Sequence, residues 1–76
     1  MHRYLITVDM NRTVSDRAVV LDLARLGYIT EHVMVPVSSK DTYVDFAVRS
    51  TRGGAEVLLW FEDVGRYITN IVKVSS

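Results

Sequence analysis

Cysteine is absent from the sequence, proline occurs once, and nine basic side chains are balanced by nine acidic ones. Without cysteine there are no disulfides, thiolate metal sites or cysteine nucleophiles. A net charge of zero means that the chain lacks the overall positive field typical of nucleic-acid-binding proteins. Long apolar runs are also missing, since Asp9 interrupts the first one. We therefore expect no signal peptide, no membrane span, and a cytoplasmic protein, for which a phage-type setting is a conjecture.

The composition that is present is that of a folded domain. Of the 76 residues, 49% are hydrophobic and 24% are charged, which is too apolar for a disordered tail. A chain this short forms a single domain, residues 1–76, and buries only about 60% of its unfolded surface. The stability margin of such a domain is thin.

Hydrophobic periodicity predicts six secondary-structure elements. Strands are expected over 3–10, 29–37, 42–50 and 67–74, and helices over 14–26 and 54–65. The order is βαββαβ, which resembles the ferredoxin-like plait. This resemblance implies an α+β fold, in which a four-stranded antiparallel sheet ordered 4-1-3-2 carries both helices on one face.

Several residues mark where these elements begin and end. Thr13 or Ser15 is expected to cap the first helix, and Gly27 and Gly65 are expected to end the two helices. Pro36 cannot donate a hydrogen bond within a sheet, so its strand is expected at an edge. A polar turn should join this strand to the next as a hairpin.

The apolar stripes of these elements define a predicted core. The predicted core comprises Leu23, Val44, Phe46, Val57 and Phe61. On the second helix, Val57, Trp60, Phe61 and Val64 share the stripe that is expected to be buried. A Phe61→Ala change in such a core is expected to cost roughly 3–5 kcal/mol.

The sheet face away from the helices mixes apolar, aromatic and charged side chains. It is expected to comprise Leu5, Thr7, Asp9, Tyr43, Asp45, Ala47 and Arg49, together with Tyr67, Thr69, Ile71 and Lys73 of the last strand. An RNA-recognition motif stacks bases on aromatic side chains of its two central strands, where this face offers only Tyr43. Asp45 beside it would repel phosphate. Nucleic-acid binding through this face is therefore an alternative that we do not favour.

Apolar side chains outside the predicted core favour association with a protein. The candidate partner-binding residues are Leu5, Tyr43, Asp45 and Arg49 on the sheet face, Val14, Ala18 and Leu21 on the first helix, and Leu59 on the second. The edge strand over 33–37 is a further candidate. We predict a non-enzymatic interaction module that forms a homodimer or binds a protein partner, and that regulates or inhibits a larger complex.

Residues able to carry catalysis or hold a metal are scattered. His2 and His32 lie thirty residues apart, and the spacings of zinc motifs are missing. Asp9 and Asn11 can hold a divalent cation through oxygen ligands, or Asp9 can close an Asx turn, which is the interpretation that we favour. We predict no catalytic residue, no cofactor and no metal.

A glycine pair before the second helix offers one further site. Backbone amides at Gly53 and Gly54, with Arg52 beside them, can meet an anion. No phosphate-loop motif accompanies them in the sequence. A tight turn that needs glycine is therefore the favoured interpretation.

Three segments are similar to the ACT regulatory domain. They are YLITVD (4–9), LARLGYI (23–29) and GRYITNIVKV (65–74). This resemblance implies a side-by-side dimer that binds an amino acid near the loop after the first strand, although Asn11-Arg12-Thr13 stands where that family has a Pro-Gly turn. The fold is also similar to that of the small CRISPR spacer-acquisition nuclease, whose aspartate at the end of the first strand is matched by Asp9. That second resemblance implies a metal-dependent nuclease.

Overall fold

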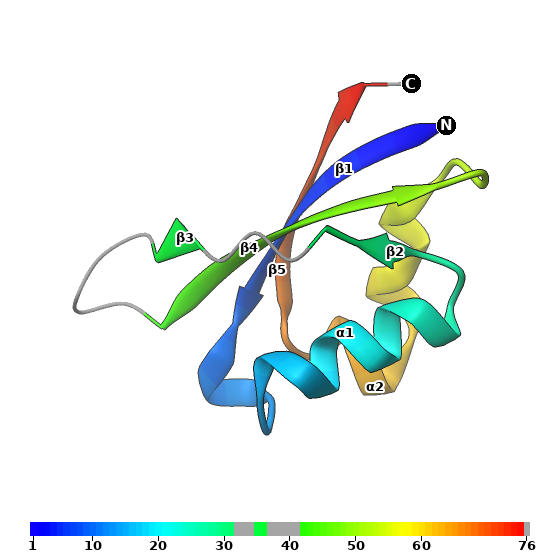
Figure 1. Ribbon diagram of the computed structural model, residues 1–76. Coiled ribbons are helices and arrows are strands. Elements are labelled where there is room, and N and C mark those ends of the chain that lie inside the picture. Colours follow the sequence, from blue (N-terminus) through cyan, green and yellow to red (C-terminus); the bar gives the residue numbers. More distant parts are fainter. Residues whose placement is uncertain (32–34, 37–41, 76) are drawn as a thin grey trace.

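The fold combines one antiparallel sheet with short helical segments (Figure 1). The structure is a computed structural model that describes residues 1–31, 35–36 and 42–75. In chain order, with η for a 3-10 helix, the elements are β1 (His2–Asp9), η1 (Met10–Arg12), α1 (Asp16–Arg25), β2 (Ile29–Thr30), β3 (Val35–Pro36), β4 (Tyr43–Ser50), η2 (Ala55–Trp60), α2 (Glu62–Gly65) and β5 (Ile68–Ser75). The predicted α+β class is confirmed.

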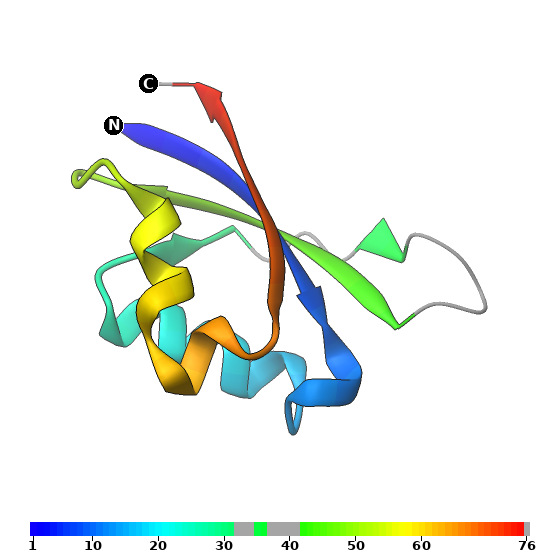
Figure 2. The ribbon, with the colours of Figure 1, turned by 180° about the vertical axis from the view of Figure 1, so that it is seen from behind.

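The strands form one sheet in the order β2-β4-β1-β5, with β3 also paired to β4. Within the described ranges every strand pair is antiparallel. β1 pairs with β4 over its full length, from His2 opposite Ser50 to Asp9 opposite Tyr43. β2 and β3 follow one another along the same edge of β4, and β5 forms the other edge (Figures 1 and 2). The sheet is therefore open.

The helical segments cover one face of this sheet (Figures 1 and 2). Along β1 the side chains of Tyr4, Ile6 and Val8 are buried against them, while most of the residues between are half-buried. β4 repeats this alternation from Val44 to Val48. The predicted assignment of faces is correct for these two strands.

Local sequence sets the ends of α1. The Ser15 hydroxyl accepts a hydrogen bond from the Ala18 backbone N–H at 3.2 Å, so Ser15 rather than Thr13 is the N-cap. At the other end Gly27 has a φ of +92°, a left-handed conformation that suits glycine and ends the helix as predicted.

No helix in the described ranges has the length and apolar composition needed to cross a bilayer.

The predicted helix over 54–65 is wrong in its type and in its buried face. The chain instead forms the 3-10 helix η2, leaves helical geometry at Phe61, and continues as the single turn α2. Residues three apart share a face of a 3-10 helix, so Ala55 and Leu58 are buried together. Trp60 is 81% exposed and Phe61 is 43% exposed. Both aromatic side chains therefore lie largely outside the core that was expected to hold them.

The last strand departs from its predicted alternation because β5 contains a bulge. Thr7 pairs with Asn70 and Val8 pairs with Ile68, which leaves Thr69 as an extra residue. One extra residue reverses the faces of a strand beyond it. The β5 residues that share the open face with Leu5 and Thr7 are Asn70 and Val72, not Ile71 and Lys73 as expected.

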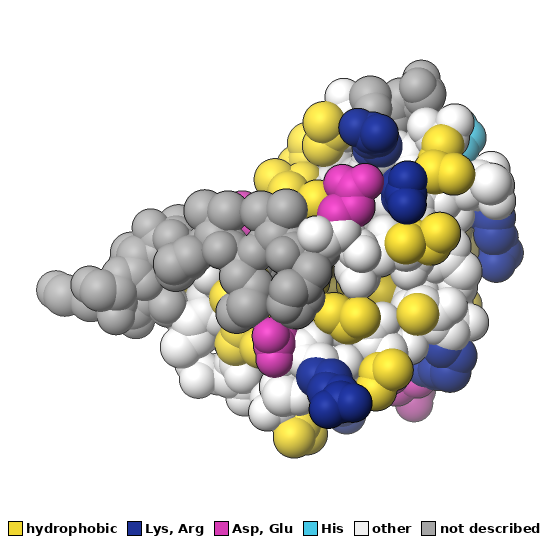
Figure 3. Space-filling model, viewed as in Figure 1, with side chains coloured by type: hydrophobic (Ala, Val, Ile, Leu, Met, Phe, Trp, Pro, Cys, Tyr) yellow, Lys and Arg dark blue, Asp and Glu magenta, His cyan; other side chains and the backbone are white. Residues whose placement is uncertain are grey.

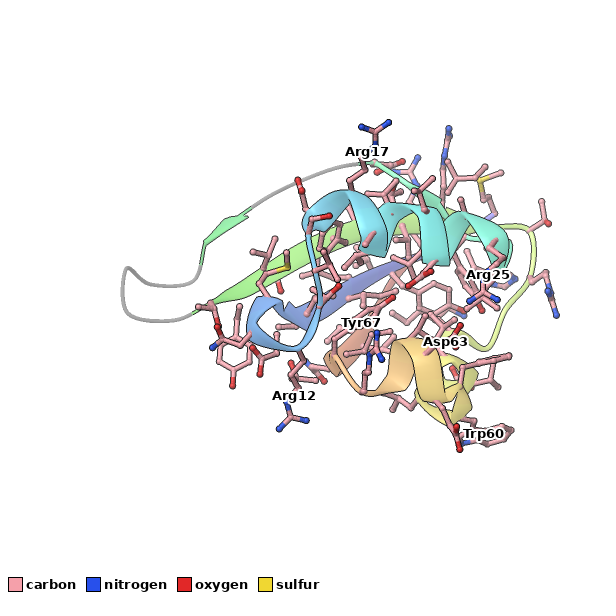
Figure 4. The ribbon with its side chains drawn as sticks, turned by 90° about the horizontal axis from the view of Figure 1, so that it is seen from below. Arg12, Arg17, Arg25, Trp60, Asp63 and Tyr67 are labelled. Carbon is pink, nitrogen blue, oxygen red and sulfur yellow. The ribbon has the colours of Figure 1, made fainter. Side chains whose placement is uncertain are left out.

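Tyr67 was expected on the open face and is instead the largest of the fully buried side chains. It precedes β5, and its hydroxyl donates a hydrogen bond to Asp22 Oδ2 of α1 at 3.1 Å (Figure 4). Burial raises the pKa of this hydroxyl, and the adjacent Asp22 carboxylate raises it further. Tyr67 thus ties the chain after α2 to α1.

The buried apolar side chains form one cluster between the sheet and the helical segments. Its members are Tyr4, Ile6, Val8, Val19, Leu23, Tyr28, Val44, Phe46, Val48, Ala55, Leu58, Val64, Tyr67 and Ile68. Leu23, Val44 and Phe46 are buried as predicted, whereas Val57 is only half-buried. Leu58 is fully buried, whereas Phe61, which was expected in the core, is 43% exposed.

The predicted edge strand over 29–37 is described in part. β2 lies at the edge of the sheet, where that strand was expected. β3 continues along the same edge of β4. Val33, Val37 and the predicted turn before Thr42 lie outside the described residues.

Candidate partner-binding surface

Three large apolar side chains are exposed in succession at the end of η2. Leu59 is 48% exposed, Trp60 81% and Phe61 43%. Figure 4 shows Trp60 directed away from the body of the molecule. Burial of such side chains on binding is favourable, and aromatic residues bury the largest areas. We call Leu59, Trp60 and Phe61 the η2 surface.

The local backbone keeps the η2 surface outside the core. At Phe61 the backbone is extended, with φ −87° and ψ 124°, and the chain then folds back into α2. The Gly65 N–H donates to the Phe61 carbonyl at 2.6 Å. A Cβ on Gly65 would lie 2.5 Å from the Leu59 carbonyl oxygen. Only glycine at position 65 therefore allows α2 to lie this close to the end of η2. This close approach fixes the direction of the η2 surface.

A pocket of about 250 Å³ adjoins the η2 surface and opens to solvent. Its lining residues are Arg25, Leu26, Gly27 and Tyr28 from the end of α1 and the segment after it, Arg52 from the loop after β4, and Val57, Leu58 and Phe61. We call it the Arg52 pocket. Because Phe61 belongs to both features, they form one continuous surface.

The two arginines of the pocket differ in their partners. Arg25 is paired with Asp63 of α2 and lies 4.0 Å from Asp22 (Figure 4). Arg52 is exposed and, in the part of the chain that the structure describes, pairs with no carboxylate. A Cβ on Gly27 would lie 3.7 Å from Cδ and Nη1 of Arg52, so the side chain lies over the end of α1. Within the described ranges, the pocket therefore carries one arginine that is held by acidic neighbours and one that pairs with no carboxylate.

Tyr28 connects the pocket to the core. It is 3% exposed and packs edge-on against Tyr4, with ring centroids 6.5 Å apart and an interplanar angle of 72°. Burial raises the pKa of its hydroxyl, the Tyr4 hydroxyl and the Glu56 carboxylate raise it as well, and the Arg52 guanidinium lowers it. The phenol is therefore neutral at pH 7, and both Arg52 and Glu56 lie close enough to influence it.

The open sheet face brings together four of the predicted partner-binding residues, Leu5, Tyr43, Asp45 and Arg49. Two polar contacts cross this face. The Thr7 hydroxyl donates to Asp45 Oδ1 at 2.6 Å, and Arg49 Nε lies 3.7 Å from Glu31 Oε1. Leu5 is half-buried between its neighbours. Ile29, Tyr43 and Val72 expose apolar area on this face, together with the charged side chains of Asp45 and Arg49.

The predicted apolar stripe on α1 is incomplete. Leu21 is 63% exposed and Ala18 is half-buried. Val14 is 92% exposed but precedes the Ser15 cap, so it does not share a helical face with the other two. On the side of the molecule seen in Figure 3, hydrophobic side chains form small groups separated by charged ones. Leu59, the remaining predicted residue, belongs to the η2 surface.

The carboxylate of Asp9 is occupied by local contacts. Its Oδ1 accepts hydrogen bonds from the Asn11 N–H at 3.0 Å and from the Thr42 hydroxyl at 3.2 Å, and Oδ2 lies 3.5 Å from Arg12 Nε. The first of these bonds closes the Asx turn that we favoured. His32 lies outside the described residues, and within them no three His, Asp or Glu side chains gather as metal ligands.

The helical period of 3.6 is the reason that sequence reasoning missed the aromatic part of this surface. A period of 3.6 assigns Trp60 and Phe61 to the core. From the sequence, Arg52 is considered only as a neighbour of the glycine turn. In the structure Gly54 has a φ of +77° and its N–H donates to the Tyr4 hydroxyl at 3.0 Å, so that amide is already bonded. A usable signal was present: residues 57–61 are five consecutive large apolar residues, more than one helical face buries.

No family model, curated protein or solved structure matches this chain. The resemblances to the ACT domain and to the spacer-acquisition nuclease therefore stay predictions from residue pattern. The candidate surface is accordingly assigned from the geometry of this chain alone.

Proposed function

We propose that this protein is a non-enzymatic protein-interaction module that acts as a regulator or inhibitor of a larger complex. The observation that carries the proposal is the exposure of Trp60, at 81%, between Leu59 and Phe61. Tryptophan is the residue type most enriched among those that dominate binding energy at protein interfaces. An exposed tryptophan lowers the solubility of the free chain, and a bound partner would remove this effect by covering the side chain.

The folded core does not need the η2 surface. Leu58 and Ala55 close the core beneath η2, and Val64 does so beneath α2. Three adjacent large apolar side chains beyond that core form the kind of patch that marks an interaction site. The sheet face is a weaker candidate, because the Asp45 carboxylate at its centre is bonded to Thr7 and disfavours both phosphate and apolar partners.

The fold belonging to this proposal is a ferredoxin-like plait. Its support is that β2 and β3 pair with the same edge of β4, which allows them to be counted as one interrupted strand. Counted in that way, the strands have the order 2-3-1-4, which is 4-1-3-2 from the opposite edge. A homodimer is one form that the association can take, and a cytoplasmic, phage-type setting is the context that we propose.

Native mass spectrometry of the purified protein, alone and after pull-down from its source cell, tests the proposed function. We expect the wild-type chain to be recovered as a homodimer or with a bound protein. Trp60→Ser should lose that association without a lower melting temperature, because the side chain contributes little to the core. Ile29→Ser is the matched control, since Ile29 is 52% exposed on β2.

Two outcomes would contradict the proposal in different ways. A strictly monomeric protein that retains no partner would contradict the interaction function itself. Normal association by Trp60→Ser would contradict the choice of surface, and Leu21→Glu and Tyr43→Glu would then test the helix and sheet surfaces in turn.

A further inference from the structure

The Arg52 pocket combines an apolar lining with an arginine that, among the described residues, pairs with no carboxylate. Leu26, Tyr28, Val57, Leu58 and Phe61 supply the apolar lining. A volume of about 250 Å³ is smaller than that of sites for drug-sized ligands, which are roughly 300–1,000 Å³. It suits one bulky side chain. An occupant of this pocket is therefore expected to insert a single apolar group.

The charges around the pocket restrict the occupant further. Arg25 is already paired with Asp63, whereas Arg52 pairs with no carboxylate in the described residues. A guanidinium presents planar donors that match a carboxylate in bidentate geometry. The complementary occupant thus carries a carboxylate next to its apolar group.

The same surroundings disfavour a polyanion such as RNA. The Glu56 carboxylate raises the pKa of the Tyr28 hydroxyl, and Asp63 is paired with Arg25 of the pocket lining. The charges of a phosphate chain are closely spaced, so that such a chain bound at Arg52 would be repelled by acidic groups near the pocket. A single carboxylate directed at Arg52 avoids them. The charge pattern favours a peptide with a few acidic residues over a nucleic acid.

We propose that the Arg52 pocket receives a bulky apolar side chain from an acidic segment of a partner protein, with a neighbouring carboxylate of that segment bound by Arg52. This assignment rests on the proposed interaction function and specifies the chemistry of the partner. The η2 surface lies beside the pocket and extends the contact beyond the anchor residue. Arg52 acts as the specificity-determining residue, and Phe61 as part of the apolar wall.

The probe is a random 12-residue peptide library displayed on phage and selected on the immobilised full chain. We expect enriched peptides to contain an aromatic or large aliphatic residue within a few positions of at least one Asp or Glu. An enriched peptide is then titrated into wild type, Arg52→Gln, Arg52→Lys and Arg17→Gln. Arg17 is the matched control, because it is an exposed arginine that Figure 4 shows on the side of α1 away from α2.

Binding to Arg52→Gln should be at least tenfold weaker, binding to Arg52→Lys should be intermediate, and binding to Arg17→Gln should be unchanged. Circular dichroism melts establish that all variants are folded. Enrichment of basic or uncharged peptides, an absence of enrichment, or equal binding to wild type and Arg52→Gln would each overturn the proposal. If one of these occurs while Trp60→Ser still loses its partner, the interaction function stands and the assignment of the pocket falls. If the wild-type protein also retains no partner, both fall.

Discussion

Replacement of Leu58 and of Phe61 by alanine distinguishes the observed 3-10 segment from a regular helix. Leu58 is fully buried, and a buried leucine replaced by alanine costs roughly 2–5 kcal/mol. A domain of 76 residues has a total unfolding free energy of about 4–11 kcal/mol. Leu58→Ala therefore removes a large share of the stability. At a loss of about 3 kcal/mol the melting temperature falls by roughly 12–24 °C.

Phe61→Ala should be much milder. Full burial of a phenylalanine stabilises by about 1.5–3 kcal/mol, and a side chain that is 43% exposed realises about half of that. The expected loss is about 1 kcal/mol, or a decrease of roughly 4–8 °C in melting temperature. Thermal and urea unfolding followed by circular dichroism measure both variants. If Phe61→Ala is as destabilising as Leu58→Ala, the core contains Phe61 and our account of η2 is refuted.

Three further predictions concern single residues elsewhere in the chain. Tyr67→Phe should cost about 1 kcal/mol at neutral pH through the lost hydrogen bond to Asp22. Because the folded-state pKa of Tyr67 is raised above 10, its contribution is complete below pH 10 and is lost as the pH rises above it, so wild type should lose more stability than Tyr67→Phe in alkaline urea titrations. Gly65→Ala should destabilise by roughly 1–3 kcal/mol in the same assay, since its Cβ meets the Leu59 carbonyl, and a melting temperature equal to wild type would contradict that packing. Purified protein should cleave neither DNA nor RNA with Mg²⁺ or Mn²⁺, and cleavage that disappears in Asp9→Asn would favour the nuclease interpretation instead.

The strands β1 and β4 and the helix α1 were predictable because the pattern of each depends on one periodicity. β1 and β4 alternate strictly, so a single choice of face places Ile6 and Phe46 in the core together. α1 carries its own start signal at Ser15 and its own stop signal at Gly27. Where the capping residues and the apolar pattern of an element agree in this way, the sequence predicts the element correctly.

The errors occur where one backbone irregularity changes the period. The bulge at Thr69 reverses which side chains of β5 lie on each face of the sheet after it, and no residue type in that segment predicts a bulge. In the same way, η2 buries residues that lie three apart, Ala55 and Leu58, and leaves Trp60 exposed, whereas a helical period of 3.6 predicts Trp60 in the core. Phe61 lies three residues after Leu58 and is partly exposed because the backbone is extended at that position. The aromatic part of the candidate surface was missed for these two reasons.

The close approach at Gly65 also bears on how relatives of this chain can be recognised. Any homologue that presents its exposed tryptophan in the same direction must keep a residue without a side chain five positions after it, because the Leu59 carbonyl occupies the space that a Cβ needs. A homologue that has lost this glycine has also reoriented the segment before it, and its partner need not be the same. The pair formed by Trp60 and Gly65 is therefore a short signature for tracing the binding surface through divergent sequences, in which overall identity is too low to align.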